Sequence, residues 1–165
     1  PAINPTPSVT DWCRNNNTYG PYSWDAYFLD QQYWDFFGRK YDQGGFDYWL
    51  GQLRSGLTPL ELINLFAQTA EARNVHIRSW EMGMVDRETE VITIIYRAML
   101  RYDPDTAGLN YWQSVINKLD TTPLTDHILH HNEGYRQRIQ GDTSEIPERG
   151  EWLRNEMSAN LGRIA

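Results

Sequence analysis

The chain has 165 residues, of which 40% are hydrophobic and 22% charged, a composition typical of a soluble globular protein rather than a disordered one. Fifteen basic against 22 acidic side chains give a formal net charge of -7, which disfavours nucleic acid as a partner because phosphate binding needs the opposite sign. No apolar run approaches the roughly 20 residues that a bilayer span needs, so we expect no membrane insertion. The single cysteine, Cys13, excludes an internal disulfide and cysteine-rich metal sites.

Residues 1–23 are expected to form an extended N-terminal arm, because prolines and a run of asparagines interrupt regular structure there. This stretch has neither the basic start nor the apolar segment of a signal peptide. Aromatic side chains gather in and just after it, at Trp12, Tyr19, Tyr22 and Trp24. Their flat faces, next to amides and carboxylates, suit a sugar ring or a protein surface, although packing of the arm onto the helices explains them more simply.

A repeated helical pattern follows. Apolar residues keep helical spacing from Trp24 to Phe37 and again over residues 91–100. Sliding the chain along itself so that Tyr33 meets Tyr96, an offset of 63 residues, also pairs Asp42 with Asp105, Gly45 with Gly108, Tyr48 with Tyr111 and Trp49 with Trp112. Five identities in constant helical phase predict one structural unit used twice.

Each unit is predicted to be a helix, a short turn and a second helix. In the second unit the first helix should end near Tyr102, because Pro104 disfavours helical geometry in the residue before it. Asp105 is then placed to cap the next helix, and Gly108 leaves room for two helices to approach. Asp42 and Gly45 repeat this arrangement. The pairs Thr58-Pro59 and Thr122-Pro123 predict a capped third helix in each unit.

The predicted fold is therefore all-α: two degenerate helix-turn-helix repeats packed together, an extended arm and a C-terminal helix. We expect the arm at 1–23, the two-repeat domain at 24–141, divided into 24–85 and 86–141, and the last helix at 142–165. The residues assigned to the structural motif are Tyr33, Asp42, Gly45, Tyr48, Trp49, Tyr96, Pro104, Asp105, Gly108, Tyr111 and Trp112.

Residues 95–112 resemble the signature of the domain-of-unknown-function family 4214, in which Tyr-Arg and two apolar residues precede Pro-Asp, Gly-Leu and Tyr-Trp. The second unit carries this pattern, whereas the first is degenerate, with Trp34 in the place of the arginine and Tyr41 in that of the proline. The resemblance implies a helical domain with no agreed activity, found in bacterial surface and secreted proteins and in bacteriophage structural proteins.

Two patterns resemble metal sites without completing one. The loop 103–108 has acids at the first and third positions of a calcium loop, but Ala107 and Ser114 stand where the fifth and twelfth ligands belong. His127 and His131 are one helical turn apart, so both could meet one metal, with His130 beside them. A neighbouring Glu and a third ligand, which a zinc protease needs, are not visible. We expect no metal and no cofactor.

The sequence offers no nucleophile elbow and no phosphate-binding glycine loop, so we expect no catalytic residues and no enzyme. The function that remains is a non-catalytic structural or interaction module of a bacterial surface or a virion. It would act by protein contacts or self-assembly through the arm and the last helix, at the cell surface, outside the cell or in the virion. The alternative is a carbohydrate-binding module whose aromatics Trp12, Tyr19, Tyr22 and Trp24 hold a glycan.

Overall fold

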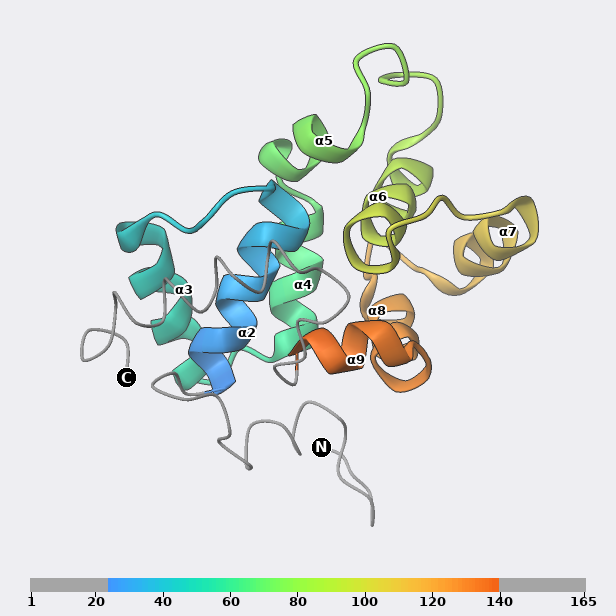
Figure 1. The fold of residues 1–165 in the computed structure, drawn as a ribbon. Coiled ribbons are helices and arrows are strands. Elements are labelled where there is room, and N and C mark those ends of the chain that lie inside the picture. The colour runs from blue at the N-terminus through green and yellow to red at the C-terminus, as the bar shows by residue number, and fades with distance from the viewer. Residues whose placement is uncertain (1–23, 140–165) are drawn as a thin grey trace.

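The computed structural model describes residues 24–139, and every regular element within them is a helix (Figure 1). The first half contains α2 (Trp24–Gln32), the π-helix η1 (Tyr33–Phe37), α3 (Gln43–Arg54), α4 (Pro59–Ala67) and α5 (Ala70–His76). The second half contains α6 (Arg87–Ile95), the π-helix η2 (Tyr96–Leu100), α7 (Thr106–Val115), α8 (Thr122–His131) and α9 (Glu133–Ile139). The all-α prediction is confirmed. The arm at 1–23 and the expected C-terminal helix at 142–165 lie outside the described residues.

The helices of the two halves begin at corresponding positions. The offset that pairs Tyr33 with Tyr96 also relates the first residues of α2 and α6, α3 and α7, α4 and α8, and α5 and α9. Both π-helices have the same bounds under this shift, and each ends at a residue in the left-handed region, Gly38 with φ 63° and Arg101 with φ 69°. Arg101 is held in this conformation while its guanidinium bonds the buried carboxylate of Asp35, 2.9 Å away.

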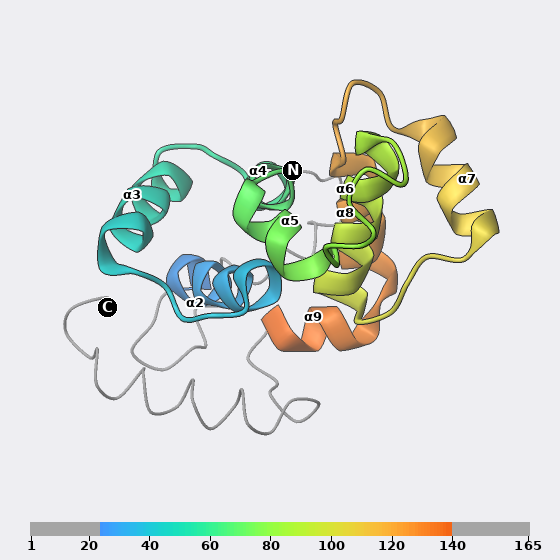
Figure 2. The same cartoon turned by 90° about the horizontal axis from the view of Figure 1, so that it is seen from above.

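The two halves pack against each other through corresponding elements. Helix α4 lies against its own counterpart α8, and η1 lies against η2. In the same way α2 packs on α9 and α5 packs on α6, two contacts that correspond to each other under the same shift, whereas α4 also contacts α6. Figures 1 and 2 show the result: α3 and α7 lie on opposite flanks, with the remaining helices between them. This is the arrangement that a twofold relation between the halves produces.

Local capping chemistry sets where the helices start. The side chains of Asp42, Thr69, Asp86 and Asp105 each accept a hydrogen bond from a backbone N–H in the first turn of the helix that follows. Thr58 adds a complete capping box with Glu61. Three of these caps, at Asp42, Thr58 and Asp105, are those that the sequence predicts.

Other local predictions are wrong. The cap of α8 is Thr121 rather than Thr122; the backbone N–H and hydroxyl of Thr121 bond Asn64 of the opposite half instead. Helix α7 ends at Val115 because the backbone of Ile116 is extended, with φ -73° and ψ 132°, and Lys118 and Leu119 then take positive φ angles. The seven-residue helices α5 and α9 were not expected, and they supply part of the contact between halves.

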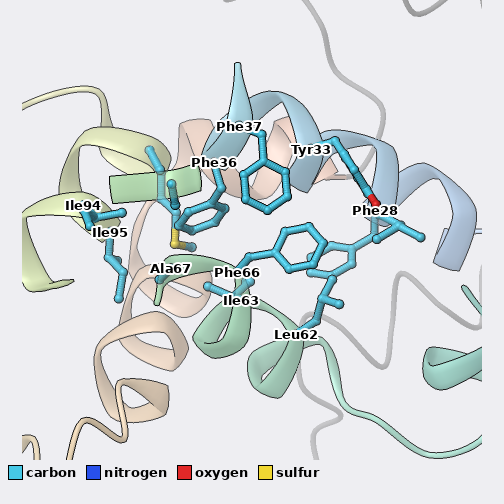
Figure 3. Packing of buried hydrophobic residues seen from close by; sticks show 14 of the residues in the cluster. Phe28, Tyr33, Phe36, Phe37, Leu62, Ile63, Phe66, Ala67, Ile94 and Ile95 are labelled. Carbon is cyan, nitrogen blue, oxygen red and sulfur yellow. The ribbon is translucent and has the colours of Figure 1, made fainter. Parts of the chain in front are cut away.

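The hydrophobic core spans both halves (Figure 3). Phe66 of α4 lies at its centre, with its ring 5.4 Å from that of Tyr33, 4.7 Å from that of Phe37 and 5.5 Å from that of Trp49. Ile94 and Ile95 extend the cluster into α6. Among the described helices, none is both long and apolar enough to cross a membrane.

Candidate functional site

The repeated Asp, Gly and Tyr residues form one small structural unit in each half. Asp42 accepts a hydrogen bond from the backbone N–H of Gly45 at 2.8 Å, and Asp105 does the same for Gly108 at 2.7 Å. The hydroxyl oxygen of Tyr33 lies only 2.6 Å from the position that a Cβ on residue 45 would take, so glycine is needed there. Burial raises the pKa of Tyr33 to about 12, with the Asp42 carboxylate adding to the effect. The aspartate, glycine and tyrosine of each half therefore contact one another where two helices meet.

The tyrosine-tryptophan pairs also adopt the same geometry twice. The Tyr48 ring meets that of Trp49 edge-on at 5.0 Å, and Tyr111 meets Trp112 at 4.8 Å. Both tyrosines are 58% exposed. The tryptophans pack inward, Trp49 on Phe66 and Trp112 beside His127. The tyrosine-tryptophan pair of the motif therefore has the same ring geometry in both halves.

A pocket of about 280 Å³ lies between the segment 77–86 and helices α6 and α7 of the second half. We call it the Arg97 pocket, after a guanidinium that is 14% exposed and contributes to its lining. Its lining includes Ile77, Trp80, Met84, Pro104 and Leu109. The pocket is therefore mainly apolar, with Pro104 of the sequence motif at one side.

The charges of the Arg97 pocket are arranged around one cation. Arg97 donates to both carboxylate oxygens of Glu81 at 2.9 Å, to Asp103 at 2.7 and 3.2 Å, and to the carbonyl of His76. The hydrogen bonds from Arg97, together with one from the backbone N–H of Arg78, lower the pKa of Glu81 to about 2. Glu90, 3% exposed, is held by Arg73 and Arg87, so its pKa is lowered too.

The mouth of the Arg97 pocket exposes large apolar side chains. Trp80 is 70% exposed, Met84 73% and Val85 49%. Sequence reasoning missed these residues because 77–86 has no helical spacing, although one Trp, two Met and one Val within ten residues of a turn segment were a usable signal. Exposed apolar residues gathered in one place are characteristic of contact surfaces.

A second pocket, of about 170 Å³, is lined by residues of η2, α7 and α8. We call it the His127 pocket. Its lining is aromatic and polar, and consists of Tyr96, Leu100, Tyr102, Trp112, Leu124, His127, Ile128, His131 and Asn132. Burial is the main cause that lowers the pKa of His127, and the neighbouring His131 lowers it further, so the imidazole is neutral at pH 7.

The two histidines lie together, as their spacing predicts. Their ring centroids are 4.3 Å apart and their planes are tilted by 33°, so the two rings are in contact with each other. His130 instead lies near Asp126, at 3.3 Å. Within the described part of the chain no group of three or more His, Cys, Asp or Glu residues is placed to hold a metal.

Of the four residues predicted to bind a partner, the structure describes only Trp24. Trp12, Tyr19 and Tyr22 fall outside the described residues. Trp24 is the first residue of α2, at the edge of the described part of the chain. The two described pockets are instead assembled by the second half, from residues distant in the sequence from this aromatic arm.

Fold and pockets together define an all-helical protein of two corresponding halves. Residues 14–76 match the model of a family described as a domain of unknown function, DUF4214. The match begins upstream of α2, ends at the last residue of α5, and is as long as the offset between the halves. It lies in the first half, whereas the sequence motif is fuller in the second. The comparisons found no similar curated protein and no similar solved structure.

The ion pairs of the Arg97 pocket predict a dependence of stability on acid. Because the pKa of Glu81 is lowered from 4.5 to about 2, its ion pair stabilises the fold fully above pH 4.5, and this contribution is lost as the pH falls towards 2. Urea unfolding of wild type and Glu81→Gln at several pH values measures this. The variant should be less stable at pH 7 and should lose less stability on acidification. Parallel profiles for the two proteins would contradict the assignment.

Proposed function

We propose that the chain is a non-catalytic interaction module that acts through protein contacts. The observation that carries this proposal is the exposed apolar cluster of Trp80, Met84 and Val85 at the mouth of the Arg97 pocket. Large aromatic and flexible thioether side chains around a concavity suit the anchoring side chain of a protein partner. We propose this surface as a contact site in addition to the aromatic arm and the C-terminal helix that the sequence predicts.

The chemistry of the Arg97 pocket supports a binding role over a catalytic one. Arg97 is ion-paired with both Glu81 and Asp103, and Glu90 is held by two arginines. The lowered pKa of Glu81 keeps that carboxylate ionised and bonded at neutral pH, which is the opposite of what a general acid needs. These charges hold the segment 77–86 in place and leave recognition to the apolar surface.

We further propose that the chain contains two copies of the DUF4214 unit, at 14–76 and 77–139. Three observations support this: the length of the family match, the recurrence of helix starts at the same offset, and the end of α9 at Ile139. In this division the segment 77–86 is the beginning of the second copy rather than a linker. It therefore corresponds to 14–23 of the first.

The setting we propose is a bacterial surface structure or a bacteriophage virion. Its support is the resemblance to the family, whose members occur in such proteins. An assembly protein in either place works by repeated contact between subunits, so a second copy of this chain is the first partner to test.

Self-association tests the interaction proposal directly. Sedimentation equilibrium of the full chain over a range of concentrations should reveal a reversible oligomer. The variant carrying Trp80→Ser and Met84→Ser should associate at least about tenfold more weakly, because it removes the apolar anchors of the contact.

Tyr48→Ser provides the matched control, since Tyr48 is similarly exposed but lies on α3, outside both described pockets. It should associate like the wild type. A wild-type monomer at every concentration, or equal weakening by the control, would argue against self-assembly through this surface.

A further inference from the structure

We propose that the His127 pocket binds an uncharged sugar. This goes beyond protein contact at the Arg97 pocket and uses different residues, so either proposal can fail alone. It also differs in place from the glycan site expected at the N-terminal aromatics. The aromatic walls of the pocket, its polar groups and its occurrence in only one half of the described residues support this proposal.

Aromatic rings form the walls of the pocket at steep angles to one another. Tyr96 and Tyr102 meet at 73° with centroids 6.1 Å apart, and Trp112 meets His127 at 59° and 5.4 Å. Tyr102 is 56% exposed and stands at the edge, while Trp112 is 7% exposed and lies deeper. Sugar rings have apolar C–H faces that pack on such aromatic surfaces.

The polar groups of the pocket match hydroxyls. A neutral imidazole carries one donor and one acceptor nitrogen, and a sugar hydroxyl both donates and accepts. The lowered pKa of His127 keeps its imidazole in this neutral form at pH 7. Asn132 accepts a hydrogen bond from the backbone N–H of Tyr135 at 2.7 Å, which fixes its side-chain amide and orients the NH2 group as a donor.

Charge selects among the ligands that aromatic pockets bind. The nine lining residues include no Asp, Glu, Lys or Arg. An anion would find no cation there, and a quaternary ammonium would find no carboxylate to add to the ring faces. Among the described residues, no third His, Cys, Asp or Glu joins the two histidines to complete a metal site. An uncharged polyol with an apolar face fits best what remains.

The corresponding face of the first half is closed. The counterparts of His127 and His131 are Asn64 and Gln68 on and just after α4. Asn64 accepts hydrogen bonds from Thr121, and Gln68 donates to the carbonyl of Leu119 at 2.9 Å, so the α7–α8 connection covers this face. The second half keeps the equivalent place open and lines it with aromatic and imidazole groups.

Binding is tested on the full chain with a glycan array that holds neutral and sialylated glycans. Chitotriose, maltotriose and lactose are then titrated by NMR, with backbone amide shifts as the readout. We expect the chain to bind a neutral glycan on the array, and we expect the backbone amide shifts to be largest around Tyr102, His131 and Asn132. Tyr102→Ala should weaken the affinity about tenfold, while Tyr48→Ala, equally exposed on α3, should leave it unchanged.

The shift map keeps the test independent of whether any variant folds well. The proposal is overturned if no neutral glycan binds, if only charged glycans bind, or if the shifts map to another surface. It is equally overturned if Tyr48→Ala weakens binding as much as Tyr102→Ala. Zinc chloride added alone serves as a further probe. Amide shifts at both histidines with zinc, and none with any sugar, would overturn the sugar proposal and identify the pocket as a metal site.

Discussion

Replacing Phe66 by alanine should destabilise the protein by about 4 kcal/mol, as measured by urea unfolding at pH 7. Phe66 is 1% exposed, and its ring is in contact with those of Tyr33, Phe37 and Trp49. Removing it leaves a cavity that three rigid aromatic rings cannot collapse to fill, so the loss of packing adds to the loss of burial.

The control for this substitution is Leu65→Ala, one residue earlier on α4. Leu65 is 45% exposed, and its truncation should change the free energy of unfolding by less than about 1 kcal/mol. If the two variants lost similar stability, Phe66 would not be the centre of the core that joins η1, α3 and α4.

Alanine at Gly45 should destabilise the protein by about 2 kcal/mol, although alanine normally favours a helix over glycine. The added Cβ would stand 2.6 Å from the Tyr33 hydroxyl and 2.8 Å from a carboxylate oxygen of Asp42. Tyr33 is 2% exposed and confined by neighbouring rings, so it cannot move aside cheaply. Urea unfolding at pH 7 measures the loss.

Alanine substitutions at two other glycines, Gly51 and Gly108, serve as controls for the effect on the free energy of unfolding. Gly51 lies on the same helix, with nothing within 4 Å of the position that an added Cβ would take, so Gly51→Ala should stabilise by about 1 kcal/mol. At Gly108 the closest atoms are 3.0 and 3.1 Å away, and the half-buried Tyr96 has more freedom, so the two effects should nearly cancel. Destabilisation by Gly51→Ala, or stabilisation by Gly45→Ala, would contradict the assigned role of close approach.

Sequence reasoning succeeded where the physical cause is local. A capping aspartate acts on a backbone N–H three residues away, so Asp42 and Asp105 were predictable from spacing alone. The same holds for Gly45 and Gly108, because the repeat showed that each glycine is retained beside its cap. The tyrosine that closes over each glycine was identified as part of the repeat, but its contact was not.

The remaining features depend on distant parts of the chain. Thr121 occupies the N-cap position of α8 but makes no side-chain cap, because its hydroxyl and backbone N–H donate to Asn64 of the opposite half. The Arg97 pocket requires Glu81 and Asp103 to meet one guanidinium across three segments. Helices α5 and α9 are too short for a clear periodic signal and are stabilised by packing against α6 and α2.

The contacts of α4 with α8 and of η1 with η2 join the two halves of the fold. Because α4 packs on α8 and η1 packs on η2, either half alone would leave the contacting faces of these elements exposed to water. Each half thus buries these faces only against the other half, and one polypeptide that carries both supplies the complementary surface at a high local concentration. Covalent linkage replaces what would otherwise be a bimolecular encounter.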